Sequence, residues 1–266
     1  MKKEGDDDDE KTEVKKAIKG PWTADRRPPE WEKVWELVTE MRGQTEAPVD
    51  TEGCERLAER GAVSEKAFRF QTLVALMLSS QTKDTITAAA VRRLQAHCRT
   101  LSGGGGALSV GAMLLLSEEE VKRLITGVGF HNRKAQYLLR TAALLRERHD
   151  DDIPSSVAGL CQLPGVGPKM AHLAMQAAWG VTEGIGVDVH VHRITNRLGW
   201  VRTSTPEDSR VALERWLPQS HWRPINALLV GFGQTVCSAP KPKCADCLLA
   251  HGLCPSSSIR APRPTH

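Results

Sequence analysis

The chain has 266 residues, of which 40% are hydrophobic, so it is long enough for one large or two modest domains with a buried core. Its 36 Lys and Arg against 32 Asp and Glu give a net charge of +4, and this basic excess lies in the C-terminal part, which permits a polyanionic partner. No apolar run reaches the roughly 18 residues that span a bilayer, so we expect no membrane partner.

Both ends of the chain differ in composition from the rest. Residues 1–30 mix acidic and basic tracts with few apolar side chains, and residues 257–266 are rich in Ser, Pro and Arg. Such segments bury too little apolar surface to fold, so we expect two flexible tails. The N-terminal segment has neither the apolar stretch of a secretory signal nor the acid-poor composition of a transit peptide, so it carries no readable import signal.

The middle of the chain shows helical periodicity. Residues 73–78 are apolar all round, which is typical of a fully buried helix. Ser117 and Glu120 form a capping box, and apolar residues follow at helical spacing over 121–128. The same spacing resumes over 135–142, after a turn that contains glycine. Sustained strand alternation is absent from the sequence, so we predict an all-α fold.

A glycine turn lies at residues 163–171, with the sequence LPGVGPKMA. Gly165 and Gly167 let backbone N–H groups point outward, and Pro168 suits the first position of a new helix. A helix N-terminus adds partial positive charge, so the turn predicts an anion site. On a chain with a basic C-terminal half, the natural anion is a DNA phosphate.

Lys169 falls in the first turn of that predicted helix. There the helix dipole and partial burial would both lower its pKa, and a neutral amine is a nucleophile. Attack on the sugar carbon that carries a base would displace the base and leave a Schiff base, from which the strand breaks by elimination. The motif alone leaves a second interpretation equally open, in which Lys169 only pairs with a phosphate.

Asp188 is a single carboxylate in an otherwise apolar stretch, at the predicted start of another helix. A carboxylate beside an electron-poor sugar could stabilise developing oxocarbenium charge or move the proton of the amine. Taken alone, the position favours a simpler role, in which Asp188 caps the helix.

The C-terminal part carries a cysteine site. Seven cysteines are an odd number for a disulfide framework, and four of them are spaced C-x6-C-x2-C-x6-C at Cys237, Cys244, Cys247 and Cys254. Four thiolates in so short a segment predict a metal and a reducing compartment. The pattern alone leaves zinc and an iron–sulfur cluster open, with disulfides as the weaker alternative.

The lysine and the cysteine site together resemble those of the endonuclease III family of DNA glycosylases. Residues 76–84, LMLSSQTKD, and 188–193, DVHVHR, are similar to its vertebrate members, and the resemblance covers roughly residues 31–256. The co-occurrence of the hairpin lysine and the four cysteines is what distinguishes this family from related glycosylases. In this resemblance the 8-oxoguanine branch keeps the lysine without the cluster, and the adenine-mismatch branch keeps the cluster without the lysine.

The resemblance implies roles for individual residues. Lys169 matches the Schiff-base nucleophile of the family, and Asp188 matches its catalytic aspartate. Gln81 matches the residue inserted into the gap left by the flipped nucleotide, and Phe130 lies in the loop that wedges the opposite strand. His190 resembles a residue that lines the pocket. Without the resemblance, the sequence would predict only that Gln81 and Phe130 are ordinary loop residues.

Two departures from the family pattern stand out. The last cysteine gap has six residues where the family usually has five, which could loosen the cluster loop. Val189 replaces a usual threonine, which removes a hydroxyl next to Asp188 and could alter how that carboxylate is held. Neither change removes a ligand or a catalytic group.

The resemblance implies a two-lobed helix-hairpin-helix DNA glycosylase fold with a C-terminal [4Fe-4S] cluster loop. We expect an inner helical domain over 63–182, with the helix-hairpin-helix near 155–175. A discontinuous cluster domain would pair residues 31–62 with 183–256. The active site would lie between the two lobes.

The implied function is that of a bifunctional DNA glycosylase and abasic-site lyase of base excision repair. Its substrate would be duplex DNA with an oxidised pyrimidine flipped from the stack, bound by a monomer. Further partners would be downstream base excision repair proteins, and the compartment would be the nucleus, with mitochondrial import left open.

Two other functions remain open from the sequence. One is a non-catalytic helix-hairpin-helix module that grips DNA phosphate and holds a structural zinc. The other is a monofunctional glycosylase that uses water in place of Lys169.

Overall fold

The computed structural model describes residues 27–101, 103 and 105–259. Most of the expected N-terminal tail, and residues 260–266 of the second tail, lie outside this part of the chain. Every regular element among the described residues is helical, which confirms the predicted all-α class. None of these helices combines the length and the apolar character needed to cross a membrane.

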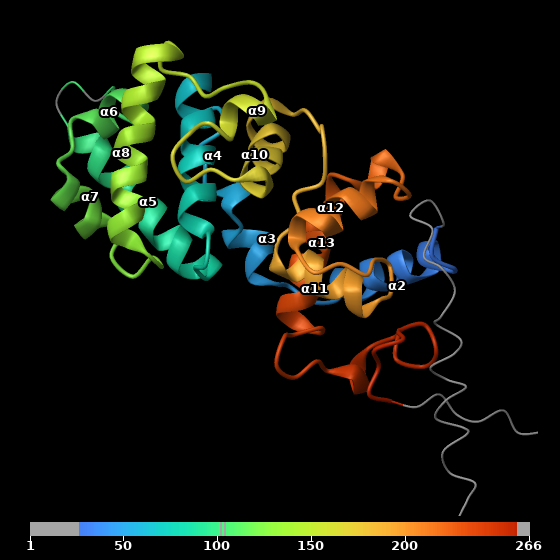
Figure 1. The fold of residues 1–266 in the computed structure, drawn as a ribbon. Coiled ribbons are helices and arrows are strands. Elements are labelled where there is room, and N and C mark those ends of the chain that lie inside the picture. The colour runs from blue at the N-terminus through green and yellow to red at the C-terminus, as the bar shows by residue number, and fades with distance from the viewer. Residues whose placement is uncertain (1–26, 102, 104, 260–266) are drawn as a thin grey trace, which may run out of the picture.

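Among the residues that the structure describes, the first lobe has seven α-helices and one π-helical turn, with a core that extends from Leu57 to Ala178. It forms the upper left part of Figure 1. Its elements are α4 (Glu65–Ser79), α5 (Asp84–Thr100), α6 (Val110–Leu114), α7 (Glu118–Leu124), α8 (His131–Arg148), α9 (Val157–Leu160), α10 (Pro168–Ala174) and η2 (Met175–Trp179).

Helix α4 is the centre of this lobe. Ser64 caps it by accepting a hydrogen bond from the backbone N–H of Ala67, and residues 73–78 are all buried, as their uniformly apolar sequence predicted. The capping box of Ser117 and Glu120 starts α7, also as predicted. The glycine-containing turn predicted after it separates α7 from α8, and Val128 is buried from within that turn.

The second lobe joins the beginning of the described chain to its end. Its core combines Trp31 and three further apolar residues of the first helix with residues between Ile185 and Leu249 (Figure 1). Its elements are α2 (Trp31–Gly43), α11 (Val189–Arg197), α12 (Pro206–Glu214), η3 (Gln219–His221), α13 (Pro224–Thr235) and η4 (Cys244–Asp246). The division of the chain into two domains at residues 63 and 183 stays a prediction. Leu57, which lies before the first of these boundaries, already packs in the first core.

Two short helices, α3 (Pro48–Glu52) and η1 (Cys54–Arg56), lead from the second lobe to the first. Helix α3 contacts both α13 and α5, so it lies between the lobes (Figure 1). A direct polar contact accompanies it. Gln234 of α13 donates to the carboxylate of Asp84 at the start of α5, at 2.7 Å, and accepts from the backbone N–H of Val49. Asp84 thereby ties the loop before α5 to the second lobe.

Candidate active site

Lys169 and Asp188 meet where the two lobes join. Lys169 is the second residue of α10 in the first lobe, and Asp188 immediately precedes α11 in the second. The Lys169 Nζ lies 4.0 Å from the Asp188 Oδ2, with 35% of the lysine side chain and 13% of the aspartate side chain exposed. An amine that solvent and a ligand can still reach therefore faces a largely buried carboxylate.

The two oxygens of Asp188 do different things. Oδ1 accepts hydrogen bonds from the backbone N–H groups of His190 and Val191, both at 2.8 Å, and so caps α11. Oδ2 faces Lys169. The capping role and the chemical role of Asp188 are thus compatible in one side chain. Val189 is 66% exposed, and both bonds to Oδ1 come from backbone, so the carboxylate is held without the hydroxyl that Val189 lacks.

His190 and Cys54 are close enough to Lys169 to feel its charge. Burial lowers the pKa of His190 against the opposing effect of the Asp188 carboxylate, and the charges of Arg193 and Lys169 lower it further. Its Nδ1 lies 3.3 Å from the Arg193 guanidinium. Burial raises the pKa of the Cys54 thiol to about 11, so this thiol stays protonated and does not compete with Lys169 as a nucleophile.

The glycine turn between α9 and α10 has the hairpin geometry that its sequence predicted, and Pro168 is the first residue of α10. Gly165 has φ 77°, and a Cβ there would lie 2.4 Å from the ring of Tyr137. Gly167 precedes α10 with an ordinary extended backbone, and a Cβ there would meet nothing within 4 Å. The turn therefore presents open space beside the helix N-terminus, next to Lys169.

The structure brings Gln81, Phe130 and Gly165 together. All three line one pocket of about 210 Å³ on the first lobe, and the lining does not include His190. Gln81 has φ 50° and Phe130 has φ 56°, both in the left-handed region that a bulky residue rarely adopts. Phe130 is 64% exposed. Two side chains at the tips of separate turns are thus displayed beside the glycine hairpin.

Reasoning from sequence missed Lys134, which also lines this pocket. It lies next to Ala135, at the start of the periodic stretch of α8. A lysine at such a position is expected to lie on the solvent-exposed face of the helix. Only 7% of it is exposed, and its Nζ donates to the backbone carbonyls of Leu78 and Ser80. The only sequence signal was its position one residue before the buried face of the helix.

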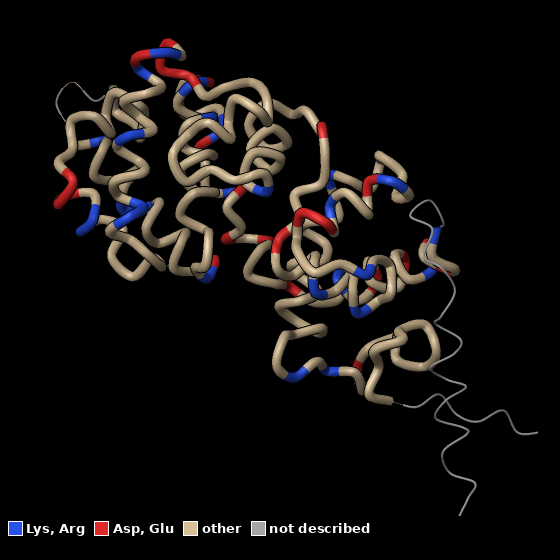
Figure 2. The backbone as a smooth tube through the Cα atoms, viewed as in Figure 1, with Lys and Arg blue, Asp and Glu red and all other residues tan. Residues whose placement is uncertain are grey.

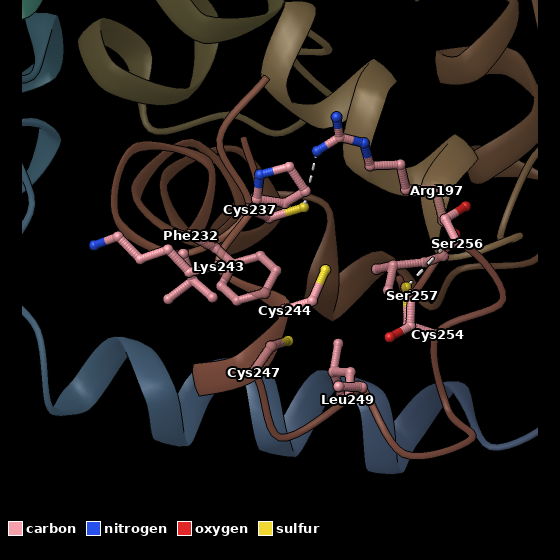
Figure 3. Close-up of a pocket in the computed structure, with 14 residues that line it drawn as sticks. Arg197, Phe232, Cys237, Lys243, Cys244, Cys247, Leu249, Cys254, Ser256 and Ser257 are labelled. Carbon is pink, nitrogen blue, oxygen red and sulfur yellow. Dashed lines mark hydrogen bonds between the residues drawn. The ribbon is translucent and has the colours of Figure 1, made fainter. Parts of the chain in front are cut away.

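The four predicted ligand cysteines line a second pocket, in the second lobe, with a volume of about 140 Å³ (Figure 3). Arg197 of α11 and Phe232 of α13 form part of its wall. The Arg197 guanidinium donates to the Cys237 Sγ at 3.3 Å and to the carbonyl of Ser238 at 2.8 Å. Ser257, which the sequence placed in the C-terminal tail, also lines this pocket.

The loop between the last two cysteines is anchored despite its extra residue. Leu249 is fully buried and Ala250 is 2% exposed, and the Cys254 N–H donates to the Leu249 carbonyl at 2.9 Å. All seven cysteines are free thiols. Among the described residues, no three His, Cys, Asp or Glu side chains are close enough to hold one metal ion together.

Charge by itself does not mark one side of the molecule as the binding side for a polyanion. Figure 2 shows basic and acidic residues intermingled over both lobes. The geometry around Lys169 is therefore more informative than the net charge.

Comparison with known proteins gives consistent matches. Residues 74–219 match the HhH-GPD superfamily base excision DNA repair protein family. The endonuclease III homolog of Schizosaccharomyces pombe is 49% identical over 232 residues, which are 86% of this chain and 63% of that protein. The endonuclease III-like protein 1 of Bos taurus is 47% identical over 233 residues, which are 87% of this chain and 73% of that protein. The chain thus spans somewhat under two thirds of the yeast relative.

Solved structures show the same likeness. A non-covalent endonuclease III–DNA complex matches with a TM-score of 0.69 at 26% identity, over 85% of this chain and 95% of that one. A trapped endonuclease III–DNA covalent intermediate matches with a TM-score of 0.67 at the same identity and coverage. A thermostable thymine-DNA glycosylase shares the fold, with a TM-score of 0.62 at 18% identity over 84% of this chain and 94% of that one.

Proposed function

The chain belongs to the endonuclease III family of base excision repair DNA glycosylases, and from that premise we propose that it removes damaged bases through Lys169 and then nicks the strand. The observation that carries the proposal is the 4.0 Å approach of the Lys169 amine to the Asp188 carboxylate between the two lobes. An amine placed only to pair with phosphate would not need a buried carboxylate beside it.

The proposed reaction follows from this pair. The neutral Nζ of Lys169 attacks C1′ of the damaged nucleotide, the C1′–N bond breaks, and its electron pair leaves with the base. Asp188 takes up the proton of the amine and stabilises the positive charge that develops on the sugar. Ring opening gives a Schiff base between Nζ and C1′. Loss of the C2′ proton then expels the 3′ phosphate, which breaks the strand.

The proposed substrate is damaged duplex DNA, bound by a monomer. Solved structures of endonuclease III, at 26% identity, are complexes with DNA, and oxidised pyrimidines are the substrate class that the family implies. Gln81 and Phe130 are the side chains that enter the duplex, and the open space at Gly167 receives a backbone phosphate. His190 contacts the flipped nucleotide from the second lobe.

The four cysteines are proposed to hold a [4Fe-4S] cluster. The four thiols line one shared pocket, and four thiolates are the donor set of such a cluster, which is also the cofactor that the family resemblance implies. When bound, the cluster would supply structural cross-linking of the C-terminal loop. We propose action on nuclear DNA, with mitochondrial DNA and downstream repair proteins as further proposed targets and partners.

Borohydride trapping tests the nucleophile. On a duplex with thymine glycol, the protein should give a covalent adduct after reduction, because borohydride fixes the Schiff base on Nζ. Lys169→Gln should give none. Lys66→Gln is the matched control, since the Lys66 ammonium is paired with Asp150 outside the site, and it should trap like the unchanged protein.

Each alternative function predicts a different outcome. Base release without an adduct would show a monofunctional glycosylase that uses water. DNA binding without base release would show a non-catalytic module. An adduct that persists at the same yield in Lys169→Gln would show that another amine is the nucleophile.

A further inference from the structure

We infer that Lys134 is a positioning residue for base extrusion, because it binds the turn that carries Gln81 to the turn that carries Phe130, so that both side chains enter the duplex as one rigid unit. The inference rests on the proposed function, in which these two side chains penetrate DNA. It assigns a task to a buried lysine that the proposed reaction does not use.

The contacts of Lys134 converge on the Gln81 turn. Its Nζ donates to the Leu78 carbonyl at 2.7 Å, to the Ser80 carbonyl at 2.6 Å, and to the Thr82 hydroxyl oxygen at 3.3 Å. The first of these acceptors lies in the last turn of α4 and the other two flank Gln81. The ammonium therefore contacts the backbone before Gln81 and the side chain of the residue that follows it.

The same network reaches the Phe130 turn. The Thr82 hydroxyl oxygen also accepts the backbone N–H of Gly129 at 3.1 Å. The two turns are packed so closely that a Cβ at Gly129 would lie 2.6 Å from the Gln81 carbonyl oxygen. Lys134 itself lies on the first turn of α8, four residues after Phe130, and its N–H donates to the Phe130 carbonyl.

The backbone strain at Gln81 and at Phe130 also supports coupling between the two turns. Gln81 and Phe130 each hold a left-handed conformation, which is unfavourable for a non-glycine residue and persists only where the surroundings impose it. Here the surroundings that impose it are shared. One ammonium and one hydroxyl contact the backbone at both tips, so a change in one turn is transmitted to the other.

The burial of Lys134 has a cost that an apolar residue would not have. Burial lowers its pKa to about 8, and its hydrogen-bond acceptors are two carbonyls and a hydroxyl. A methionine of similar length would fill the site without that cost, so the hydrogen bonds are what the lysine contributes.

Rates on two DNA substrates distinguish a positioning role of Lys134 from a merely structural one. The first is thymine glycol paired with adenine in a continuous duplex, from which the nucleotide must be extruded. The second is a preformed abasic site opposite a one-nucleotide gap, where no base pair or opposite base needs to be separated. Single-turnover base release is measured on the first, and borohydride adduct formation on the second. A 2-aminopurine beside the lesion reports unstacking.

Lys134→Met should slow base release from the paired duplex about tenfold or more, since the three hydrogen bonds from the ammonium to the Gln81 turn are lost. The rate of the 2-aminopurine signal should fall in parallel. Adduct formation at the gapped abasic site should stay within about threefold of the unchanged protein, because Lys134 does not touch the Lys169–Asp188 pair.

Thr82→Val removes the shared hydroxyl with little change in volume and should give the same split, which keeps the test available if Lys134→Met does not fold. Lys66→Met is the control, since Lys66 also donates to a backbone carbonyl, that of Asp150, at 2.6 Å. It should leave both rates unchanged.

Equal rates for Lys134→Met and the unchanged protein on the paired duplex would overturn the inference. Equal slowing on both substrates would also overturn it, because Lys134 would then act on the chemistry or on the fold as a whole. Failure of the unchanged protein to form any adduct would instead refute the proposed function, and the inference with it.

Discussion

At the scale of single residues, Asp188 shows how one side chain serves structure and chemistry through different atoms. Its Oδ1 caps α11 and its Oδ2 faces Lys169. Sequence reasoning treated the two roles as alternatives because a sequence does not show which oxygen points where.

Asp188→Asn separates the two roles. The amide oxygen can still accept both backbone N–H groups, so the free energy of unfolding should change by less than about 1 kcal/mol. The charge that takes up the amine proton is gone, so base release should slow by about 10²-fold or more. Single-turnover kinetics and chemical denaturation measure the two effects.

Asp188→Ala is the companion variant. It loses the cap as well, and should unfold about 1 kcal/mol more easily than Asp188→Asn while being similarly slow. Base release by Asp188→Asn at the rate of the unchanged protein would show that Asp188 is a cap and nothing more.

The residues of the site differ in how well the sequence alone predicts their roles. Lys169 and Asp188 could be found because each stands beside a recognisable helix start. Lys134 could not, because its role depends on the carbonyls of residues about 55 positions earlier in the chain. His190 was identified by resemblance alone, and the pocket of Gln81 and Phe130 does not include it.

At the scale of elements, alanine substitutions at the two hairpin glycines should have different effects, one on stability and the other on DNA affinity. Gly165→Ala forces a methyl group into the ring of Tyr137 at a backbone φ of 77°, and should destabilise the protein by about 1–3 kcal/mol. Gly167→Ala meets no atom within 4 Å and should fold normally. Its methyl group stands in the space proposed for a phosphate, so the Kd for abasic-site DNA should rise about tenfold.

Thermal unfolding and DNA titration distinguish the two variants. Unchanged DNA affinity in a folded Gly167→Ala protein would argue against phosphate binding at this turn. An equal loss of stability in both variants would show that the surroundings of Gly167 are tighter than the structure has them.

Helix starts were easier to predict than helix ends. Capping residues at Ser117 and Asp188 mark their helices because side-chain oxygens satisfy the first free N–H groups. Val128 continues the apolar spacing of α7 from inside the glycine-containing turn, so the spacing alone does not mark where α7 ends. That turn is shaped by its contacts with the Gln81 loop, which lies 47 residues earlier at the Thr82–Gly129 hydrogen bond.

At the scale of the whole molecule, the chain builds its two cores in an interleaved order. It begins the second core with α2, builds the first core, and then returns (Figure 1). The active-site pair lies at that return, since α10 and η2 end the first lobe and α11 resumes the second. Local periodicity predicts the helices but not this arrangement, which entered our expectations only through the family resemblance.

The cysteine pocket connects the C-terminal loop to the helix that carries Asp188. Arg197, the last residue of α11, donates to the Cys237 Sγ and to the following loop, and Phe232 of α13 forms another wall. A bound cluster would therefore stabilise the packing of α11 as well as the loop itself. Its loss should reach beyond the four ligands, to the position of Asp188.

Cys254→Ser should remove the proposed cluster, whereas Cys161→Ser, at a half-buried free cysteine outside the pocket, should not. The unchanged protein and Cys161→Ser should be brown, with broad visible absorbance and about four irons per chain. Cys254→Ser should be colourless, and its Tm should fall by on the order of 10 °C, because metal-binding free energy contributes to folding. A colourless unchanged protein with stoichiometric zinc would contradict the cluster. An unchanged iron content in Cys254→Ser would contradict the proposed set of four ligands.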